Sequence, residues 1–580
     1  MTQTSTVHSF SHSFAYNTFF NNTMTAAEKA ETETVSFDTP SEKSDNAKSQ
    51  ESSIRPEDPS KPQNDLVPAD TYSSGLTMWL SLLGVATAYF IVPLDVSIVA
   101  TAIPKITDQF QSIQDVAWYG SAFMMALGGF QSAWGKAYKY LPIKPTYLAS
   151  VFIFEIGSLL CAVAPSSMAF VIGRAIAGVG AAGIACGTMT IIAVITPPQK
   201  RPFLTSLMGA VYGISSVVGP LLGGAITEGL SWRWCFYINL PFGAVAAGIT
   251  LLVLTIPSTI KPPTTTLSEK LIQFDVLGTL LAMAMAITLV LALQCGGTSH
   301  PWSSPTVIGL LVGFILIIAT FVLWELYQGD RAAVPQRLLG RRYMWVNSIF
   351  TALFAGSFNI GLYWIPIYFQ SVSGDTPMWS GIKNISTTFS VAVTIVVSGL
   401  IASKTGIAAP LMPLGATVAT VGVGLLYMLD IGTGPGAWIG FQIVAGMGWG
   451  SAFQIPMIVA QGTSDTSDIS SVTAIILFFQ TFGGSFTLAA AQAAFSNQLI
   501  KTLPRTAPDV APDMVIATGA TELRHVFAPS QVTGILEAYV VGLQAVWAVA
   551  VGITGLAVLF SLCSRWQRLD LQVGKTSTAA

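Results

Sequence analysis

Apolar runs of about twenty residues recur along the chain, and short polar turns separate them. Each run is long enough for a helix to cross a hydrocarbon layer of ~30 Å. Repetition on this scale predicts an all-α polytopic membrane protein. The fourteen predicted transmembrane helices cover about 76–103, 116–137, 146–164, 168–195, 203–226, 235–256, 276–294, 306–327, 345–369, 381–402, 408–429, 437–460, 471–495 and 539–563.

The residues before the first apolar run have the opposite pattern. Met1 to Tyr72 hold eleven acidic and five basic side chains, together with many serines, threonines and prolines. Such a composition cannot bury a hydrophobic core, so residues 1–73 are predicted to form a disordered cytosolic tail. Two interpretations stay open for this tail: a solvated arm, or a segment that phosphorylation of its serines regulates.

The overall composition agrees with a membrane location. Hydrophobic residues make up 52% of the 580 residues and charged residues only 10%, whereas soluble proteins have about 25% charged residues. The formal net charge of −2 indicates no nucleic-acid partner. The five cysteines show no metal-ligand spacing such as CxxC, so we expect neither a metal site nor a cofactor.

The distribution of Lys and Arg between alternate loops predicts the orientation of the chain, because cytosolic loops carry the excess. One set of loops and the tail after the last span hold fifteen basic residues, whereas the opposite loops hold six. Both termini are therefore predicted in the cytosol, and the hydrophilic loop 497–538 outside. The fifteen are Lys136, Lys139, Lys144, Lys200, Arg201, Lys261, Lys270, Arg331, Arg337, Arg341, Arg342, Lys404, Arg565, Arg568 and Lys575.

An internal repeat indicates two related halves. The segment 173–183, GRAIAGVGAAG, aligns with 441–451, FQIVAGMGWGS, and places Gln442 opposite Arg174. Repeats of this kind are typical of transporters whose substrate site lies between the halves. The predicted domains are the tail 1–73, a six-helix bundle 74–257, a linker with two extra helices 258–343, a six-helix bundle 344–565 with the external loop 497–538, and a cytosolic tail 566–580.

Few ionisable residues lie inside the predicted spans, so each one is a functional candidate. Asp95 and Arg174 lie at similar depths, which differ by ~4–5 Å at about 1.5 Å per helical residue. Glu155 stands in the third span, where it serves either a structural hydrogen bond or proton transfer. Asp275 and Glu325 lie near span ends and are expected to be solvated.

Several motifs together resemble the fourteen-span drug:proton antiporters of the major facilitator superfamily, in particular fungal toxin and multidrug efflux pumps. The resemblance covers roughly residues 75–565. The segments that carry it are LDVSIVATAIP (94–104), WGKAYKYLPIK (134–144), GRAIAGVGAAG (173–183), GISSVVGPLLGG (213–224), WRWCFYINLP (232–241), the GG-PW-SP pattern of 296–305 and FFQTFGG (478–484).

The resemblance implies a fold of two six-helix bundles with two inserted helices. It also implies a transporter, not an enzyme, that uses protons to export small amphipathic organic compounds, such as a toxic secondary metabolite or drug, by alternating access. The expected location is the plasma membrane, with the vacuolar membrane as an alternative, and the expected state is a monomer in the lipid bilayer. A proton-coupled uptake permease for an iron chelate or nutrient stays open as the alternative.

The resemblance also assigns roles to residues. It places the first and fourth helices beside one cavity, where Asp95 and Arg174 could meet and switch Asp95 between proton-holding and proton-releasing states; a static salt bridge is the alternative. The antiporter motif favours export, and its small residues are expected to form a tight seam between the halves, with generic helix packing as the alternative. The motif residues are Gly213, Gly219, Pro220, Gly223 and Gly224.

One departure from the family pattern concerns the cytosolic gate. Family members often carry an acid in the loop after the second span, whereas Gly135 to Lys139 read GKAYK and contain none. This loop therefore gives no support for a charge pair that closes the gate.

Polar and aromatic residues on the expected cavity helices are candidates for substrate contact. Each could instead form an interhelical hydrogen bond or belong to the aromatic belt facing lipid. Few fixed charges and several aromatic rings favour a mostly neutral, amphipathic substrate. The candidates are Gln131, Asn359, Tyr363, Trp364, Gln442 and Gln454.

Overall fold

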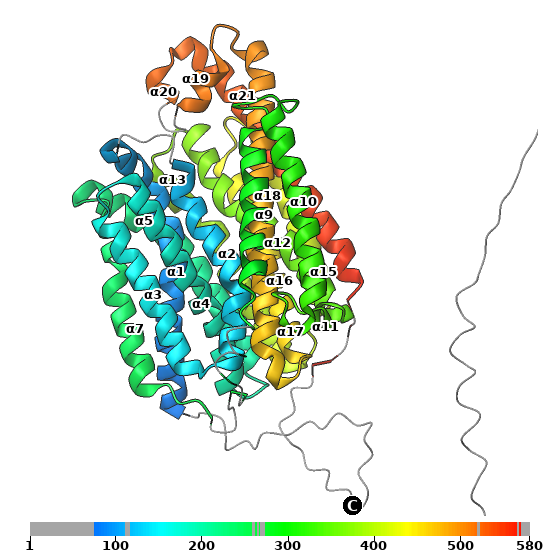
Figure 1. The fold of residues 1–580 in the computed structure, drawn as a ribbon. Helices are drawn as coiled ribbons and strands as arrows, with labels where there is room; N and C mark the ends of the chain where they lie inside the picture. The colour runs from blue at the N-terminus through cyan, green and yellow to red at the C-terminus, as the bar shows by residue number, and fades with distance from the viewer. Residues whose placement is uncertain are drawn as a thin grey trace, which may run out of the picture. The chain divides into compact units, whose positions relative to one another are not determined.

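The computed structural model describes residues 75–110, 116–257, 262–263, 266, 269, 273–518, 523–564, 566, 568 and 569. The predicted N-terminal tail and most of the C-terminal tail lie outside this part of the chain. The described residues form α-helices and short 3₁₀ turns and contain no strand, as the all-α prediction requires (Figure 1).

The first helix group packs through small residues. Gly157 of α3 lies against the backbone of Ala177 in α4, and Gly180 of α4 lies against the backbone of Phe154 in α3. A side chain at either glycine would separate the two helices, so their sequence dictates this close approach. The group consists of α1 (Gly75–Phe110), α2 (Val116–Tyr140), α3 (Ile143–Val163), α4 (Ser167–Ile195), α5 (Arg201–Gly229), α6 (Trp234–Tyr237) and α7 (Asn239–Val253).

Two helices follow that belong to neither half. They pack against each other, and α9 also lies against α2 and α18; we call α9 and α10 the inserted pair. A chain segment after α10, residues 329–341, leads to the second group, and we call it the strap. These elements are α9 (Val276–Cys295), α10 (Pro305–Gln328), η3 (Gly329–Arg331) and α11 (Gln336–Leu339).

The second helix group packs in the same manner. Gly448 of α16 lies against the backbone of Ala419 in α15, and Gly483 of α18 against Ala352 in α12. The group consists of α12 (Arg342–Ser371), α13 (Pro377–Lys383), α14 (Ile385–Thr405), α15 (Leu411–Leu426), α16 (Pro435–Ala452), α17 (Ile455–Gly462), η4 (Thr466–Asp468), α18 (Ile469–Thr506), α19 (Pro512–Ala517), α20 (Leu523–Val526) and α21 (Pro529–Leu562).

The two groups meet along two main helix pairs, α5 with α14 and α2 with α18. At α5 and α14, Gly399 lies against Ser206, and at α2 and α18, Gly135 lies against Ala474. Both contacts lie toward the end of the bundle where α2 stops and α18 starts. Lys139, Lys200 and Arg337 are also at this end, which we call the cationic end; α11 and α17 mark it at the bottom of Figure 1.

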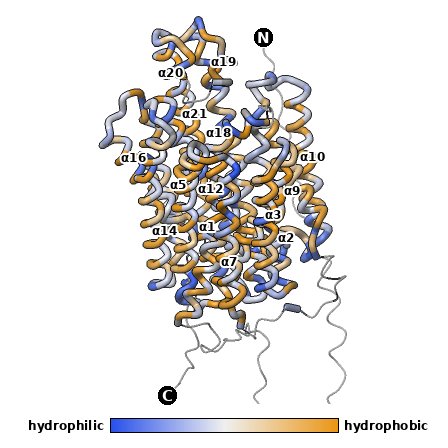
Figure 2. The backbone as a smooth tube through the Cα atoms, turned by 90° about the vertical axis from the view of Figure 1, so that its left-hand side faces the viewer, coloured by the Kyte–Doolittle hydropathy of each residue, from blue (hydrophilic) through white to orange (hydrophobic). Residues whose placement is uncertain are grey.

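Each of the fourteen predicted ranges contains a helix. Among the described residues, twelve helices are long and apolar enough to cross a membrane, and Figure 2 shows apolar residues along most of their length. The other two ranges hold α15, which has only 16 residues, and α2, which carries Gln131, Lys136 and Lys139. These polar residues lower the hydropathy of α2, and they pack against other parts of the protein.

The structure corrects one predicted loop. The segment 497–538 was expected to be a long hydrophilic connection, but α18 continues to Thr506 and α21 begins at Pro529. Leu503 and Ile535 of these helix ends are buried in one apolar cluster with residues of α19 and α20. Polarity in this region therefore comes from the exposed faces of helices that extend beyond the apolar layer. The remaining connection, with α19 and α20, lies at the top of Figure 1.

Candidate functional site

The two ionisable residues with matched depths meet inside the first helix group. Asp95 of α1 and Arg174 of α4 are both fully buried, and Nη1 of Arg174 forms an ion pair with Oδ2 of Asp95. Nε of Arg174 donates to the carbonyl oxygen of Tyr119 in α2 at 2.9 Å. A buried cation needs such partners on several of its donors. The pair therefore ties three helices of one group together.

A residue that the sequence analysis did not single out completes this network. Nδ2 of Asn239, the first residue of α7, donates to Oδ1 of Asp95 at 3.0 Å and to Oγ of Ser158 at 3.2 Å. The ring of Phe123 lies 4.4 Å from the guanidinium carbon of Arg174, within the range of a cation–π contact. The sequence signal for Asn239 is its place in the segment WRWCFYINLP (232–241), which carries the family resemblance without assigning this amide a role.

Glu155 on α3 lacks the hydrogen bond that a purely structural role would require. Both of its carboxyl oxygens are buried, and neither has a hydrogen-bond partner among the described residues. The carboxyl group lies against Gly243 of α7, where a side chain would collide with it. The predicted structural hydrogen bond is therefore absent, since the facing surface of α7 offers a glycine and no donor.

The structure corrects the expectation for Asp275 and Glu325, which are buried rather than solvated. Asp275 caps α9 by accepting from the backbone N–H of Gly278 at 2.9 Å, and it accepts from Nε1 of Trp324 at 2.7 Å. Both carboxyl groups also accept backbone N–H groups of the strap. The strap covers these span ends and takes the place of water as their hydrogen-bond partner.

The glycines of the antiporter motif occupy different surroundings from those expected. A side chain at Gly219 would collide with Ser97, and one at Gly223 would collide with Thr101, so both glycines seat α5 against α1 within the first group. Gly213 alone faces the second group, where a methyl group added to it would lie 3.9 Å from Val391, and Gly224 faces open space. Pro220 lies inside α5 without ending the helix. The expected seam between the halves is therefore mainly a seam between α1 and α5.

Two of the glutamine candidates differ in their partners. Gln442 of α16 is buried, and its Oε1 accepts from Oγ1 of Thr387 in α14 at 2.8 Å. This contact is the interhelical hydrogen bond that was the alternative to substrate binding. Gln131 of α2 is also buried, but its Oε1 has no partner among the described residues.

The other four substrate candidates lie in different surroundings and do not form one site. Asn359 donates to Ala355 of its own helix, α12, at 2.8 Å. Tyr363 is exposed, whereas Trp364 is buried and packs on Phe495 with ring centroids 4.8 Å apart. Gln454, at the start of α17, is buried and lies close to Gly209 of α5, which belongs to the first group. Of these four, Gln454 lies directly at the contact between the groups.

A row of aromatic rings crosses from one group to the other beside Gln454. Ring centroids are 6.4 Å apart for Tyr89 and Tyr212, 6.3 Å for Tyr212 and Phe453, and 4.8 Å for Phe453 and Phe358. The rings come from α1, α5, the end of α16 and α12. Their role could not be predicted from the sequence, because aromatic residues at single positions of apolar helices give no separate signal.

A cavity of about 590 Å³ lies elsewhere, between α2, α3 and α9. Its lining is apolar and includes Phe130, Trp134, Pro142 and Leu280. None of the six predicted substrate residues lines this cavity. It is a product of the inserted pair, since α9 forms one of its walls.

The family described as Major Facilitator Superfamily matches residues 85–488. The chain belongs to the major facilitator superfamily. This member is therefore a multi-pass membrane transporter for a small-molecule substrate, and the fold class and family predicted from the sequence are confirmed.

Similar proteins include several fungal transporters. The chain is 47% identical to "MFS-type transporter grgE" of Penicillium sp, over 91% of this chain and 94% of that protein. It is 46% identical to "Probable efflux pump gsfJ" of Penicillium aethiopicum, over 86% and 90%. It is 38% identical to "Dehydrocurvularin exporter" of Aspergillus terreus, over 86% and 88%.

Solved structures show the same fold at low identity. The human organic anion transporter MFSD10 (TETRAN) superposes with a TM-score of 0.55 and 12% identity, over 84% of this chain and 100% of that chain.

Proposed function

We propose that this superfamily member is a proton-coupled exporter of small amphipathic organic compounds, such as a toxic secondary metabolite or drug. The observation that carries this proposal is its 46% identity, over most of both chains, to a protein named as a probable efflux pump. The 38% identity to a protein named as an exporter of dehydrocurvularin supports the same direction of transport and the same class of compound.

Proton coupling is assigned to Asp95, Arg174 and Glu155. An ionised carboxylate without a partner is very costly in an apolar interior, so the Glu155 carboxyl is expected to hold a proton in this conformation. Asp95 forms an ion pair with Arg174 and accepts a hydrogen bond from Asn239. Movement of α4 relative to α1 would leave Asp95 without its cation, and proton uptake by Asp95 would then compensate for the loss.

Substrate contact is assigned to the aromatic row and to Gln454. Aromatic rings offer large flat surfaces, and an amide offers both a donor and an acceptor, so the set suits neutral amphipathic compounds with a planar part. Its position between the two helix groups fits alternating access, in which the groups rock about a central site. Gln131 and Tyr363 remain candidates for the same site.

The remaining assignments rest on charge for the orientation, and on superfamily membership for the location, the monomeric state and the domain ends. The cationic end is placed in the cytosol, with both termini on that side, because cytosolic loops carry the excess of Lys and Arg. The plasma membrane is the proposed location, with the vacuolar membrane as the alternative. The chain is proposed to act as a monomer, and the two six-helix domains are proposed to end near residues 257 and 565.

Accumulation of labelled compounds in cells tests the direction of transport. Overexpression of the chain is expected to lower the steady-state content of neutral aromatic compounds, and removal of the gene is expected to raise it. Cells that express Asp95→Asn at the same level provide the matched control, and they should behave like cells without the gene. Lower accumulation on removal of the gene would contradict export and would indicate an uptake permease.

A further inference from the structure

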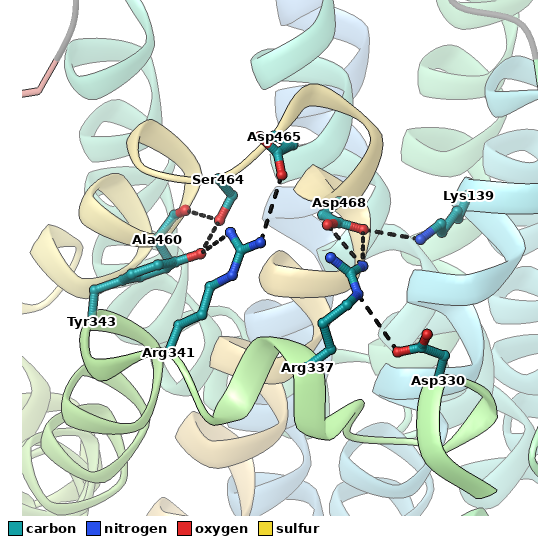
Figure 3. A network of polar contacts seen from close by, with 9 residues as sticks. All are labelled: Lys139, Asp330, Arg337, Arg341, Tyr343, Ala460, Ser464, Asp465 and Asp468. Carbon is teal, nitrogen blue, oxygen red and sulfur yellow. Dashed lines mark hydrogen bonds and ion pairs between the residues drawn. The ribbon is translucent and has the colours of Figure 1, made fainter. Parts of the chain in front are cut away.

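Three charged side chains meet at the cationic end, and each comes from a different part of the molecule. Lys139 lies in the last turn of α2 in the first group, Arg337 lies on α11 in the strap, and Asp468 precedes α18 of the second group (Figure 3). Nζ of Lys139 lies 3.0 Å from Oδ1 of Asp468, and Nη2 of Arg337 lies 2.9 Å from both carboxyl oxygens. One carboxylate is therefore shared by two cations.

The surroundings of Asp468 indicate that the two cations determine its orientation. Asp468 occupies the N-cap position of α18, where an aspartate usually accepts a backbone N–H group of its own helix. Here its side chain forms no cap hydrogen bond, and it turns to Lys139 and Arg337 instead. The Asp468 side chain is only 3% exposed, whereas Lys139 and Arg337 are 24% and 44% exposed. Of the three charged side chains, only the Asp468 carboxylate is buried, and it depends on the two cations as its partners.

The strap that carries Arg337 is fixed to its neighbours on both sides. The backbone N–H of Ala333 donates to Asp275 at 2.9 Å, and that of Val334 donates to Glu325 at 2.7 Å. These carboxyl groups belong to the inserted pair. Nζ of Lys136 in α2 donates to the carbonyl oxygen of Arg331. A strap held at these points moves with the inserted pair and α2.

The same end holds close contacts between the two groups. Sγ of Cys186 in α4 lies 4.0 Å from the carbonyl oxygen of Ser470, two residues after Asp468. Nε2 of Gln461 in α17 donates to the carbonyl oxygen of Met189 in α4 at 3.4 Å. The shared carboxylate therefore lies at the place where the groups touch, and Cys186 is a fully buried thiol at that contact.

We propose that Lys139, Arg337 and Asp468 form a latch that holds the cationic ends of the two groups together, and that the strap couples this latch to the inserted pair. The inference rests on the proposed transport cycle, in which the cationic end must open for substrate to enter from that side. The latch supplies from the second group the acid that the loop at 135–139 lacks. Lys139, Arg337 and Asp468 act as positioning residues, because they set the closed state and do not contact substrate.

The reactivity of Cys186 measures the opening of this end without any substrate. Cys161, Cys235, Cys295 and Cys563 are replaced by serine in the full-length chain, which is purified in nanodiscs, and the rate of Cys186 alkylation by N-ethylmaleimide is followed. Lys139→Gln and Arg337→Gln are each expected to raise the rate roughly three- to tenfold, as expected for the loss of one coupled contact. Asp468→Asn removes the negative charge that the two cations share. In that background, adding Lys139→Gln or Arg337→Gln should change the rate less than about 1.5-fold.

The matched control is Asp465→Asn, three residues before Asp468. Asp465 is 69% exposed and pairs with Arg341 only at 3.8 Å, so this variant should label at the rate of the parent. Thermal unfolding of each variant reports whether it folds, and if Asp468→Asn does not fold, the two cation variants still carry the test. An unchanged rate in Arg337→Gln would show that the strap does not take part in the latch. Unchanged rates in both cation variants would show that these residues do not hold the two groups together. Neither outcome would affect export, which the accumulation experiment tests separately.

Discussion

Two ion-pair sites use the same chemistry in opposite surroundings. Asp95 and Arg174 are fully buried within one helix group, and further donors and a ring complete their contacts. Asp468 at the cationic end is buried, but its partners Lys139 and Arg337 remain partly exposed and come from different parts of the chain. The first pair cannot separate without exposing charges to an apolar interior, whereas the second can separate into water. The comparison therefore distinguishes a pair inside one half, to which we assign proton coupling, from a pair that can open between the halves.

The largest effect is expected from breaking the buried pair. Asp95→Asn leaves the Arg174 guanidinium without its counter-charge, and such a change costs about 3–5 kcal/mol of unfolding free energy. We also expect loss of pH-driven exchange, with substrate binding retained. Thermal unfolding measures the first effect, and transport into proteoliposomes under an imposed pH gradient measures the second. Unchanged coupling in this variant would remove Asp95 from the proton path.

A smaller effect is expected from the amide that supports Asp95. Asn239→Ala removes a hydrogen bond to a charged group and should cost about 1.5–3 kcal/mol. The ion pair itself remains, so coupling to the pH gradient should weaken without disappearing. Ser158→Ala, which removes only the second acceptor of Asn239, is the matched control and should have the smaller effect on unfolding. Equal losses in both variants would contradict a specific role of Asn239 at Asp95.

The packing of α1, the helix that carries Asp95, is tested by two neighbouring glycines. Gly223→Ala places a methyl group against Thr101 and Ile98, and overpacking of this kind costs about 1–3 kcal/mol. Gly224→Ala meets no atom within 4 Å and should be neutral or slightly stabilising. Thermal unfolding of the two variants in the same detergent measures the difference. Ala favours helix over Gly, so equal effects of the two substitutions would show that the α1–α5 contact at Gly223 does not limit side-chain size.

The smallest effect on stability is expected at the cationic end. Lys139→Gln should change the unfolding free energy by less than about 1 kcal/mol, because partly exposed ion pairs contribute little. Raising the ionic strength should reduce even this difference, because salt screens exposed charges. Thermal unfolding at low and high salt measures it. A loss as large as that of Asp95→Asn would contradict the distinction between the two sites.

The sequence predicts the helices well because each span has a strong local signal. Apolar length placed a helix in all fourteen ranges. Similar depth in the membrane related Asp95 to Arg174 although 79 residues separate them, once the family resemblance had placed the first and fourth helices beside one cavity. The loop at 497–538 was wrong because hydropathy does not distinguish a polar helix end from an irregular connection. Helix existence is thus a local property, whereas helix length beyond the apolar layer depends on tertiary packing.

The contacts that could not be predicted join residues far apart in the chain. Lys139 and Asp468 are 329 residues apart, and nothing near either residue identifies the other. Asp275 and Glu325 looked solvated because the sequence does not show that the strap returns to cover them. The glycines of the antiporter motif in α5 were expected to face the other half, but most of them face α1. A small-residue face does not show in the sequence which neighbouring helix it contacts.

The length of α10 has a consequence of its own. Within this helix only Val307 and Glu325 are buried, and Glu325 holds the strap at the backbone of Ala333 and Val334. An apolar exchange on its lipid-facing surface leaves that contact intact. A single inserted residue, however, rotates everything beyond it by about 100° and would turn Glu325 and the strap that follows it away from Asp275 at the start of α9. The helix is therefore tolerant in composition but constrained in residue count, which makes insertions there more damaging than substitutions.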